Sequence, residues 1–131
     1  MAQLRNILIL TTDEDFRRKC TQYLVEHDCA AKVLHKSSDA VLSVLEDEID
    51  VLIFDADCEE LSSVTTTVKI IEKCRPRIPI VVASSDRSIV SGSTILKEGI
   101  FYYLIKPLEA AELGEVVERA LVKRAYLEKG R

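Results

Sequence analysis

The chain lacks several features that mark special classes of protein. Its 131 residues include no tryptophan, three prolines and four glycines, and they contain no internal repeat or low-complexity tract. No apolar run approaches the roughly 18 residues that suggest a membrane span. The first residues, MAQLRN, also lack the apolar segment of a secretory signal. We therefore expect a cytoplasmic protein with no membrane partner.

Neither the cysteines nor the basic residues form a pattern that indicates a special function. Cys20, Cys29, Cys58 and Cys74 form no CxxC pair and lack the spacing of metal ligands, so we predict that they are reduced thiols. The 18 basic residues are outnumbered by 22 acidic ones, which gives a net charge of −4. An acidic surface gives no electrostatic reason to expect nucleic acid as a partner.

The remaining composition is that of an ordinary globular protein. Hydrophobic residues make up 47% of the chain and charged residues 31%. Because a domain usually has about 100 to 200 residues, the length accommodates one of them without a linker. We predict a single domain over residues 1–131.

Short apolar runs alternate with segments of helical spacing. The apolar runs predict strands over residues 6–10, 30–35, 50–54, 78–83 and 102–106, and the spacing predicts helices over 16–25, 38–48, 61–74, 88–97 and 108–129. The alternation is typical of an α/β fold with a parallel sheet, and the weak second run suits an edge strand. In such sheets the functional site lies beyond the carboxyl ends of the strands.

Those strand ends carry a recognisable set of side chains. DVLIFD ends in Asp55, IPIVVASS ends in hydroxyls that begin at Ser84, and GIFYYLIKPL contains Lys106 followed by proline. Taken together, these segments resemble the receiver domain of bacterial two-component response regulators. The resemblance implies a flavodoxin-like (βα)5 fold, a doubly wound five-stranded parallel sheet of order 2-1-3-4-5, and a signalling role rather than an enzyme.

The resemblance also implies a role for each matching position. Asp55 corresponds to the phosphoacceptor, Ser84 to the hydroxyl that binds the phosphoryl group, Lys106 to its cationic partner, and Tyr103 to the aromatic residue that switches rotamer. The residue types suit the chemistry, because a carboxylate can attack phosphorus while a lysine and Mg²⁺ neutralise the phosphoryl oxygens. Partners implied are a histidine kinase, an effector domain or a regulator, and a homodimer through the last two βα units.

The chain departs from the family where two acidic residues should follow the first strand. It has Thr11 and Thr12 there, and neither can supply the missing negative charge. Because Mg²⁺ usually needs one or two carboxylates, we predict weak Mg²⁺ binding through Asp55 and the backbone of Asp57. A shift in register would let Asp13 contribute as a metal ligand. The segment ADCEELSS also replaces the family's usual turn, which affects the loop that carries Asp57.

Each of these residues also has a purely structural interpretation. Thr11 and Glu14 fit a capping box at the start of a helix. Asp55 can be a carboxylate at a strand end that pairs with Lys106. Counting only these two charges gives −1 + 1 = 0, so we predict a direct ion pair in which the lysine replaces the metal.

Three functions remain open at this point. The first is an atypical receiver that acts through protein contacts and has impaired Mg²⁺-dependent phosphorylation. The second is a working receiver phosphorylated on Asp55 by a histidine kinase, which the joint presence of Asp55, Ser84 and Lys106 favours. The third is a small-molecule-binding domain on the flavodoxin-like fold, because fold does not fix function.

Overall fold

The computed structural model describes residues 4–129, in which five strands alternate with five helices. The elements are β1 (Arg5–Leu10), α1 (Glu14–Glu26), β2 (Cys29–Leu34), α2 (Ser37–Glu46), β3 (Val51–Asp55), the 3₁₀ helix η1 (Ala56–Cys58), α3 (Leu61–Cys74), β4 (Ile80–Ser84), α4 (Ile89–Leu96), β5 (Tyr102–Ile105) and α5 (Ala110–Lys129). The predicted segments match these elements to within a few residues at each end, as expected from the frayed ends of helices and strands.

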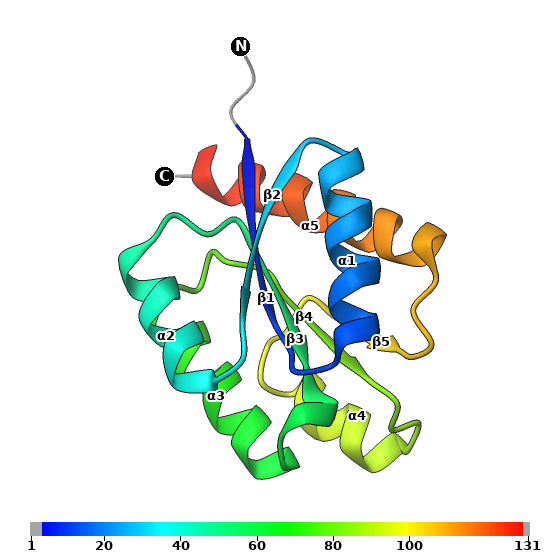
Figure 1. Cartoon of the computed structure of the whole chain (residues 1–131). Helices are drawn as coiled ribbons and strands as arrows, with labels where there is room; N and C mark the ends of the chain where they lie inside the picture. Colours follow the sequence, from blue (N-terminus) through cyan, green and yellow to red (C-terminus); the bar gives the residue numbers. More distant parts are fainter. Residues whose placement is uncertain (1–3, 130–131) are drawn as a thin grey trace.

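All neighbouring strands are parallel, and their order is β2-β1-β3-β4-β5. This confirms the predicted flavodoxin-like α/β fold. The weak second run is indeed an edge strand, because β2 pairs only with β1. In Figure 1 the helices lie on both sides of the twisted sheet, with α1 and α5 on one side and α2, α3 and α4 on the other.

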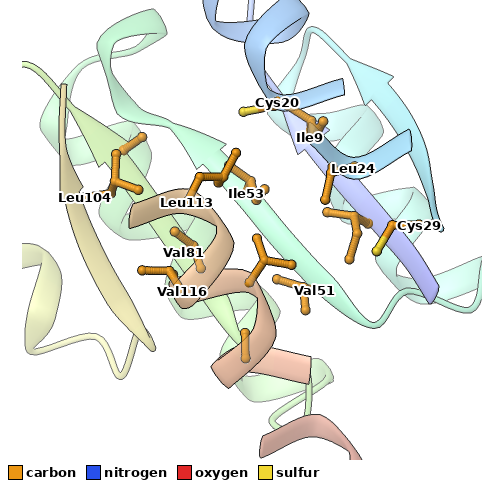
Figure 2. Close-up of a cluster of buried hydrophobic side chains, with 14 of the residues drawn as sticks. Ile9, Cys20, Leu24, Cys29, Val51, Ile53, Val81, Leu104, Leu113 and Val116 are labelled. Atoms are coloured by element: carbon orange, nitrogen blue, oxygen red, sulfur yellow. The ribbon is translucent and has the colours of Figure 1, made fainter. Parts of the chain in front are cut away.

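The two faces of the sheet each bury an apolar cluster. Ile9, Ile53 and Val81 face α1 and α5, where they pack with Leu24 and Leu113 (Figure 2). The opposite cluster lies under α2, α3 and α4. β3 and β4 are buried along their whole lengths, which explains why their sequences are continuously apolar rather than alternating.

Helices α1 and α5 approach each other closely at Gly114. A Cβ atom built on this residue would lie 2.5 Å from Oη of Tyr23 in α1. The Tyr23 ring is itself stacked on His27, with the ring centroids 4.0 Å apart. Glycine at position 114 therefore makes room for the tyrosine, even though glycine inside a helix costs about 0.8–1.0 kcal/mol relative to alanine.

Within residues 4–129 there is no helix long and apolar enough to cross a membrane. The cysteines at positions 20, 29, 58 and 74 are free thiols, with Cys20 and Cys29 buried in the core.

Candidate functional site

Asp55 is the last residue of β3, and its side chain is completely buried. Its Oδ1 accepts a hydrogen bond from Nζ of Lys106 at 2.8 Å and another from the backbone N–H of Asp57 at 3.0 Å. Its Oδ2 accepts from Oγ1 of Thr11 at 2.7 Å and from Sγ of Cys58 at 3.3 Å. Both oxygens of this carboxylate are therefore already committed to partners within the protein.

Lys106 follows β5 and brings its ammonium group into the same site. The predicted ion pair with Asp55 is confirmed, because Nζ and Oδ1 are 2.8 Å apart. Nζ also lies 3.1 Å from Oδ2 of Asp57 and 3.5 Å from Oδ2 of Asp13. It further stands 4.7 Å from the centroid of the Phe16 ring, where a cation is attracted by the face of the aromatic ring.

These contacts correct the predicted charge balance. The count from the sequence included Asp55 and Lys106 alone and gave zero. The structure adds the carboxylates of Asp13 and Asp57 to the same ammonium group, so the formal sum is −3 + 1 = −2. The sequence-based count failed because it placed Asp57 in the site only through its backbone and admitted Asp13 only through a shift in register.

The Asp57 side chain turns toward the end of β4. Its Oδ1 accepts hydrogen bonds from Oγ of Ser84 at 3.2 Å and from the backbone N–H of Ser85 at 3.0 Å. The Ser85 N–H also lies 3.2 Å from Oδ2. Because Lys106 contacts Oδ2, this carboxylate is held by residues at the ends of both β4 and β5.

The two threonines after β1 have structural partners on the neighbouring loop. Thr11 is 1% exposed, and its hydroxyl donates to Asp55 while accepting from the N–H of Asp13. Thr12 donates both its N–H and its hydroxyl to Sγ of Cys58, at 3.2 and 3.0 Å. Thr11 thus presents a hydroxyl donor to the phosphoacceptor position, where the family has an acid.

The predicted capping box of Thr11 and Glu14 is wrong. The residue that caps α1 is Asp13, whose Oδ1 accepts from the N–H groups of Asp15 and Phe16 at 3.0 and 3.2 Å. The Thr11 hydroxyl accepts from the N–H of Asp13 rather than from that of Glu14, because α1 begins only at Glu14. Aspartate is as good a cap as threonine, so the helix loses nothing by starting two residues later.

Ser84 and Tyr103 are joined through the loop between β4 and α4. Oγ of Ser84 accepts from the N–H of Asp86 at 3.0 Å. The carbonyl oxygen of Asp86 in turn accepts from the hydroxyl of Tyr103 at 2.9 Å. The ring of Tyr103 is partly buried against the core cluster under α4 and lies 3.6 Å from the position of a Cβ on Gly92.

Burial and charge act in opposite directions on the ionisable groups of the site. Burial raises the pKa of Asp57, but the Ser85 N–H and Lys106 outweigh it and place the pKa below the usual 3.8. Burial lowers the pKa of Lys106, but the carboxylates of Asp55 and Asp57 outweigh it and raise the pKa above 10.5. The ammonium and the Asp57 carboxylate therefore stabilise each other in their charged forms.

The donor set includes carboxylates suited to Mg²⁺, but their arrangement does not fit a metal ion. Across residues 4–129 no group of three or more histidine, cysteine or acidic residues is placed to hold one. The space between the carboxylates of Asp13, Asp55 and Asp57 is taken by the Lys106 ammonium group instead.

Comparison with known proteins identifies the family. The profile of the response regulator receiver domain matches residues 7–118. The chain belongs to the response regulator receiver domain family. Receiver domains of this family serve two-component signalling. Family membership favours the two receiver interpretations over the small-molecule-binding one.

Individual relatives agree with this assignment. The transcriptional regulatory protein ZraR of Salmonella typhimurium is 33% identical over 87 residues, which cover 66% of this receiver domain and 20% of that protein. The chain thus spans about a fifth of the length of this curated relative.

Two solved structures share the fold. A CheY-like receiver domain protein from Methanospirillum hungatei superposes with a TM-score of 0.85 at 18% identity, over 95% of this receiver domain and 98% of the other chain. The receiver domain of a sensor histidine kinase from Pseudomonas aeruginosa gives a TM-score of 0.80 at 19% identity, over 91% and 98%. That second protein has a magnesium ion coordinated in its active site cleft.

The structure thus brings Thr11, Asp13 and Lys106 to Asp55 or to each other, with Ser84 linked to them through Asp57, whereas Tyr103 reaches Ser84 only through Asp86. The sequence analysis missed two groups of the site. One is the side chain of Asp57, and the other is the thiol of Cys58, which contacts both Asp55 and Thr12. The spacing Asp55-x-Asp57-Cys58 was visible, but nothing in it tells which way a short 3₁₀ turn directs its side chains.

Proposed function

We propose that this receiver domain acts through protein contacts and that Mg²⁺-dependent phosphorylation of Asp55 is impaired. The observation that carries the proposal is the occupation of both Asp55 oxygens, by Lys106 and the Asp57 N–H on one side and by Thr11 and Cys58 on the other. The Lys106 ammonium group also lies between the carboxylates of Asp13, Asp55 and Asp57, where a metal ion would otherwise bind.

Phosphorylation has a clear chemical requirement at this residue. An oxygen of Asp55 must leave its hydrogen-bond donors and attack the phosphorus of a donor, such as a kinase phosphohistidine or a small acyl phosphate. An oxygen–phosphorus bond then forms, and the bond from phosphorus to the donor breaks with its electron pair leaving on the donor. Lys106 lies close enough to neutralise the transferred group, but the hydroxyl of Thr11 and the thiol of Cys58 hold the second oxygen in place.

A second function is supported by the same site. Asp55, Ser84 and Lys106 all lie at the carboxyl ends of neighbouring strands, linked through Asp57, as a working phosphoacceptor site requires. In that case a histidine kinase would be the phosphodonor. The classes of partner in either case are a kinase, an effector domain or another regulator. A homodimer through the last two βα units, β4–α4 and β5–α5, is a further expectation.

Acetyl phosphate distinguishes the two functions. The protein is incubated with acetyl phosphate, with and without Mg²⁺, and intact-mass spectrometry measures the fraction that gains a phosphoryl group. We expect a small fraction in the wild type that Mg²⁺ does not increase, and none in Asp55→Asn. Near-complete labelling of the wild type with Mg²⁺, absent from Asp55→Asn, would instead establish a working phosphoacceptor.

A further inference from the structure

Three hydrogen-bond donors converge on one anion in this site, and that anion belongs to the protein. Oγ of Ser84, the N–H of Ser85 and Nζ of Lys106 lie 3.2, 3.0 and 3.1 Å from the carboxylate oxygens of Asp57. A hydroxyl, a backbone amide and an ammonium group form a typical binding site for a tetrahedral anion such as phosphate.

The same donors stand beside the phosphoacceptor. Lys106 bonds to Asp55 and Asp57 with a single ammonium group, so a phosphoryl group carried by Asp55 would meet the donors that Asp57 now uses. We propose that the Asp57 carboxylate is a built-in occupant of this anion-binding site and competes with any phosphoryl or phosphate anion for Ser84, Ser85 and Lys106. This inference rests on the proposed function, because it gives Asp57 a part in the impaired phosphorylation of Asp55.

The backbone around Asp57 favours this occupancy. Asp57 lies in the 3₁₀ turn η1, and its own N–H is fixed by Oδ1 of Asp55 at 3.0 Å. The turn therefore presents the Asp57 carboxylate to the end of β4 at hydrogen-bond distance. An incoming phosphate must displace a tethered group that has a high effective concentration. The lowered pKa of Asp57 agrees with a carboxylate that is stabilised in its charged form.

The Asp57 carboxylate is also linked by hydrogen bonds to residues outside the pocket. Ser84 bonds to the N–H of Asp86, whose carbonyl oxygen accepts from the Tyr103 hydroxyl. The Asp57 carboxylate is thus one end of a continuous chain of hydrogen bonds that fixes the β4–α4 loop and ends at Tyr103. Removing the carboxylate should loosen this loop in the absence of any ligand.

Inorganic phosphate is a suitable probe, because it needs neither metal nor covalent chemistry. The full chain is titrated with phosphate in the presence of a metal chelator, and the amide signals of Ser85 and Asp86 are followed by NMR. We expect Asp57→Ala to bind phosphate with a Kd at least about tenfold lower than the wild type. The Asp57→Ala amides of Ser85 and Asp86 should also exchange hydrogen faster than those of the wild type before phosphate is added.

A matched control separates this contact from a general change in charge. Glu60 is exposed, makes no side-chain capping hydrogen bond and lies three positions further along the chain. Glu60→Ala removes the same charge and should leave the phosphate Kd at the wild-type value. Equal phosphate binding by wild type and Asp57→Ala would overturn the inference, and so would an equal gain in Glu60→Ala.

Two additional variants keep the outcome decisive. If Asp57→Ala does not fold, Asp57→Asn serves instead. A smaller gain in phosphate affinity is expected for it, because its amide oxygen is a weaker acceptor for the serine donors and it lacks the charge that holds Lys106. Repeating the comparison in an Asp55→Asn background, which cannot be phosphorylated, separates this inference from the proposed function. If Asp57→Ala still binds phosphate about tenfold more tightly in the Asp55→Asn background, the competition by Asp57 is supported even when acetyl phosphate labels the wild type fully. If the gain disappears in that background, the competition by Asp57 is contradicted and the proposed function is not affected.

Discussion

Thr11 donates a hydrogen bond from its Oγ1 to Oδ2 of Asp55 at 2.7 Å, and both side chains are buried. The partners lie 44 positions apart in the sequence and at the ends of the adjacent strands β1 and β3. The threonine thus gives the site a neutral donor that stabilises the carboxylate, where an acid would repel it.

Replacing Thr11 by valine should destabilise the fold. Valine has nearly the same shape and lacks the hydroxyl, so the variant removes a hydrogen bond to a charged acceptor, worth about 1.5–3 kcal/mol. Thr11→Ser keeps the hydroxyl and should lose less stability. Urea denaturation measures both variants. A Thr11→Val protein as stable as the wild type would show that Asp55 does not depend on this donor.

Replacing Lys106 by methionine should be more severe. The change leaves the completely buried Asp55 without its ion partner, and breaking such a buried pair costs on the order of 3–5 kcal/mol. Adding Asp55→Asn to Lys106→Met should recover part of that loss, because it removes the unpaired charge. The free energy of unfolding in a chelating buffer tests this, and a double variant less stable than Lys106→Met would contradict it.

Restoring the acids should strengthen Mg²⁺ binding. Thr11→Asp with Thr12→Asp adds two carboxylates next to Asp55, and Mg²⁺ affinity depends on such hard anionic ligands. Calorimetry near neutral pH should show at least about a tenfold gain over the wild type. Thr11→Asn with Thr12→Asn is the uncharged control and should show no gain. Micromolar Mg²⁺ affinity in the wild type would contradict the predicted weak binding.

The contribution of the Asp57–Lys106 pair to stability should be constant over a wide pH range. The pKa of Asp57 is below 3.8 in the fold, so its contribution is present above 3.8 and is lost as the pH falls through the lowered pKa. The pKa of Lys106 is above 10.5, so its contribution is complete below 10.5 and is lost as the pH rises through the raised pKa.

Denaturation of wild type and Asp57→Asn across pH, without metal, measures this contribution. We expect a constant difference in unfolding free energy between about pH 5 and pH 9, which then shrinks in acid below 3.8 and in alkali above 10.5. A difference that changes steeply near neutral pH would show that another group controls the pair.

Gly114 and Tyr23 should be coupled. Gly114→Ala gains helix propensity of about 0.8–1.0 kcal/mol, but its Cβ would stand 2.5 Å from Oη of Tyr23. Relieving that clash costs roughly 1–3 kcal/mol, so the single variant should be destabilised. In a Tyr23→Ala background the same substitution should become stabilising. A double-mutant cycle by urea denaturation gives the coupling, and an additive result would show that the tyrosine moves aside freely.

The fold was predictable because its signals are local and repeated. β3 and β4 are buried on both faces, which makes VLIFD and IVVAS continuously apolar apart from their last residues. The burial of Leu113, Val116 and Val117 in α5 follows from their helical spacing. The polar positions Asp55, Ser84 and Lys106 were predictable as well, because parallel topology brings strand ends together whatever the loops do.

The side-chain contacts of the loops could not be predicted from the sequence, and the reason is physical. The hydroxyl of Thr11 donates to Asp55, and this contact spans 44 positions of the sequence. The direction of the Asp57 side chain depends on the 3₁₀ turn and on donors supplied by β4. Sequence spacing contains neither piece of information, so the charge of the pocket was undercounted.

The carboxylate of Asp13 has a contact at each of its oxygens. Oδ1 accepts from the first turn of α1, and Oδ2 lies 3.5 Å from the Lys106 ammonium group. A cation or substitution that pulls Asp13 into the pocket would take it away from the helix, where an N-cap stabilises by about 1 kcal/mol. Fraying of the α1 N-terminus, seen as faster hydrogen exchange at Asp15 and Phe16, would thus report on the charge state of the pocket from outside it.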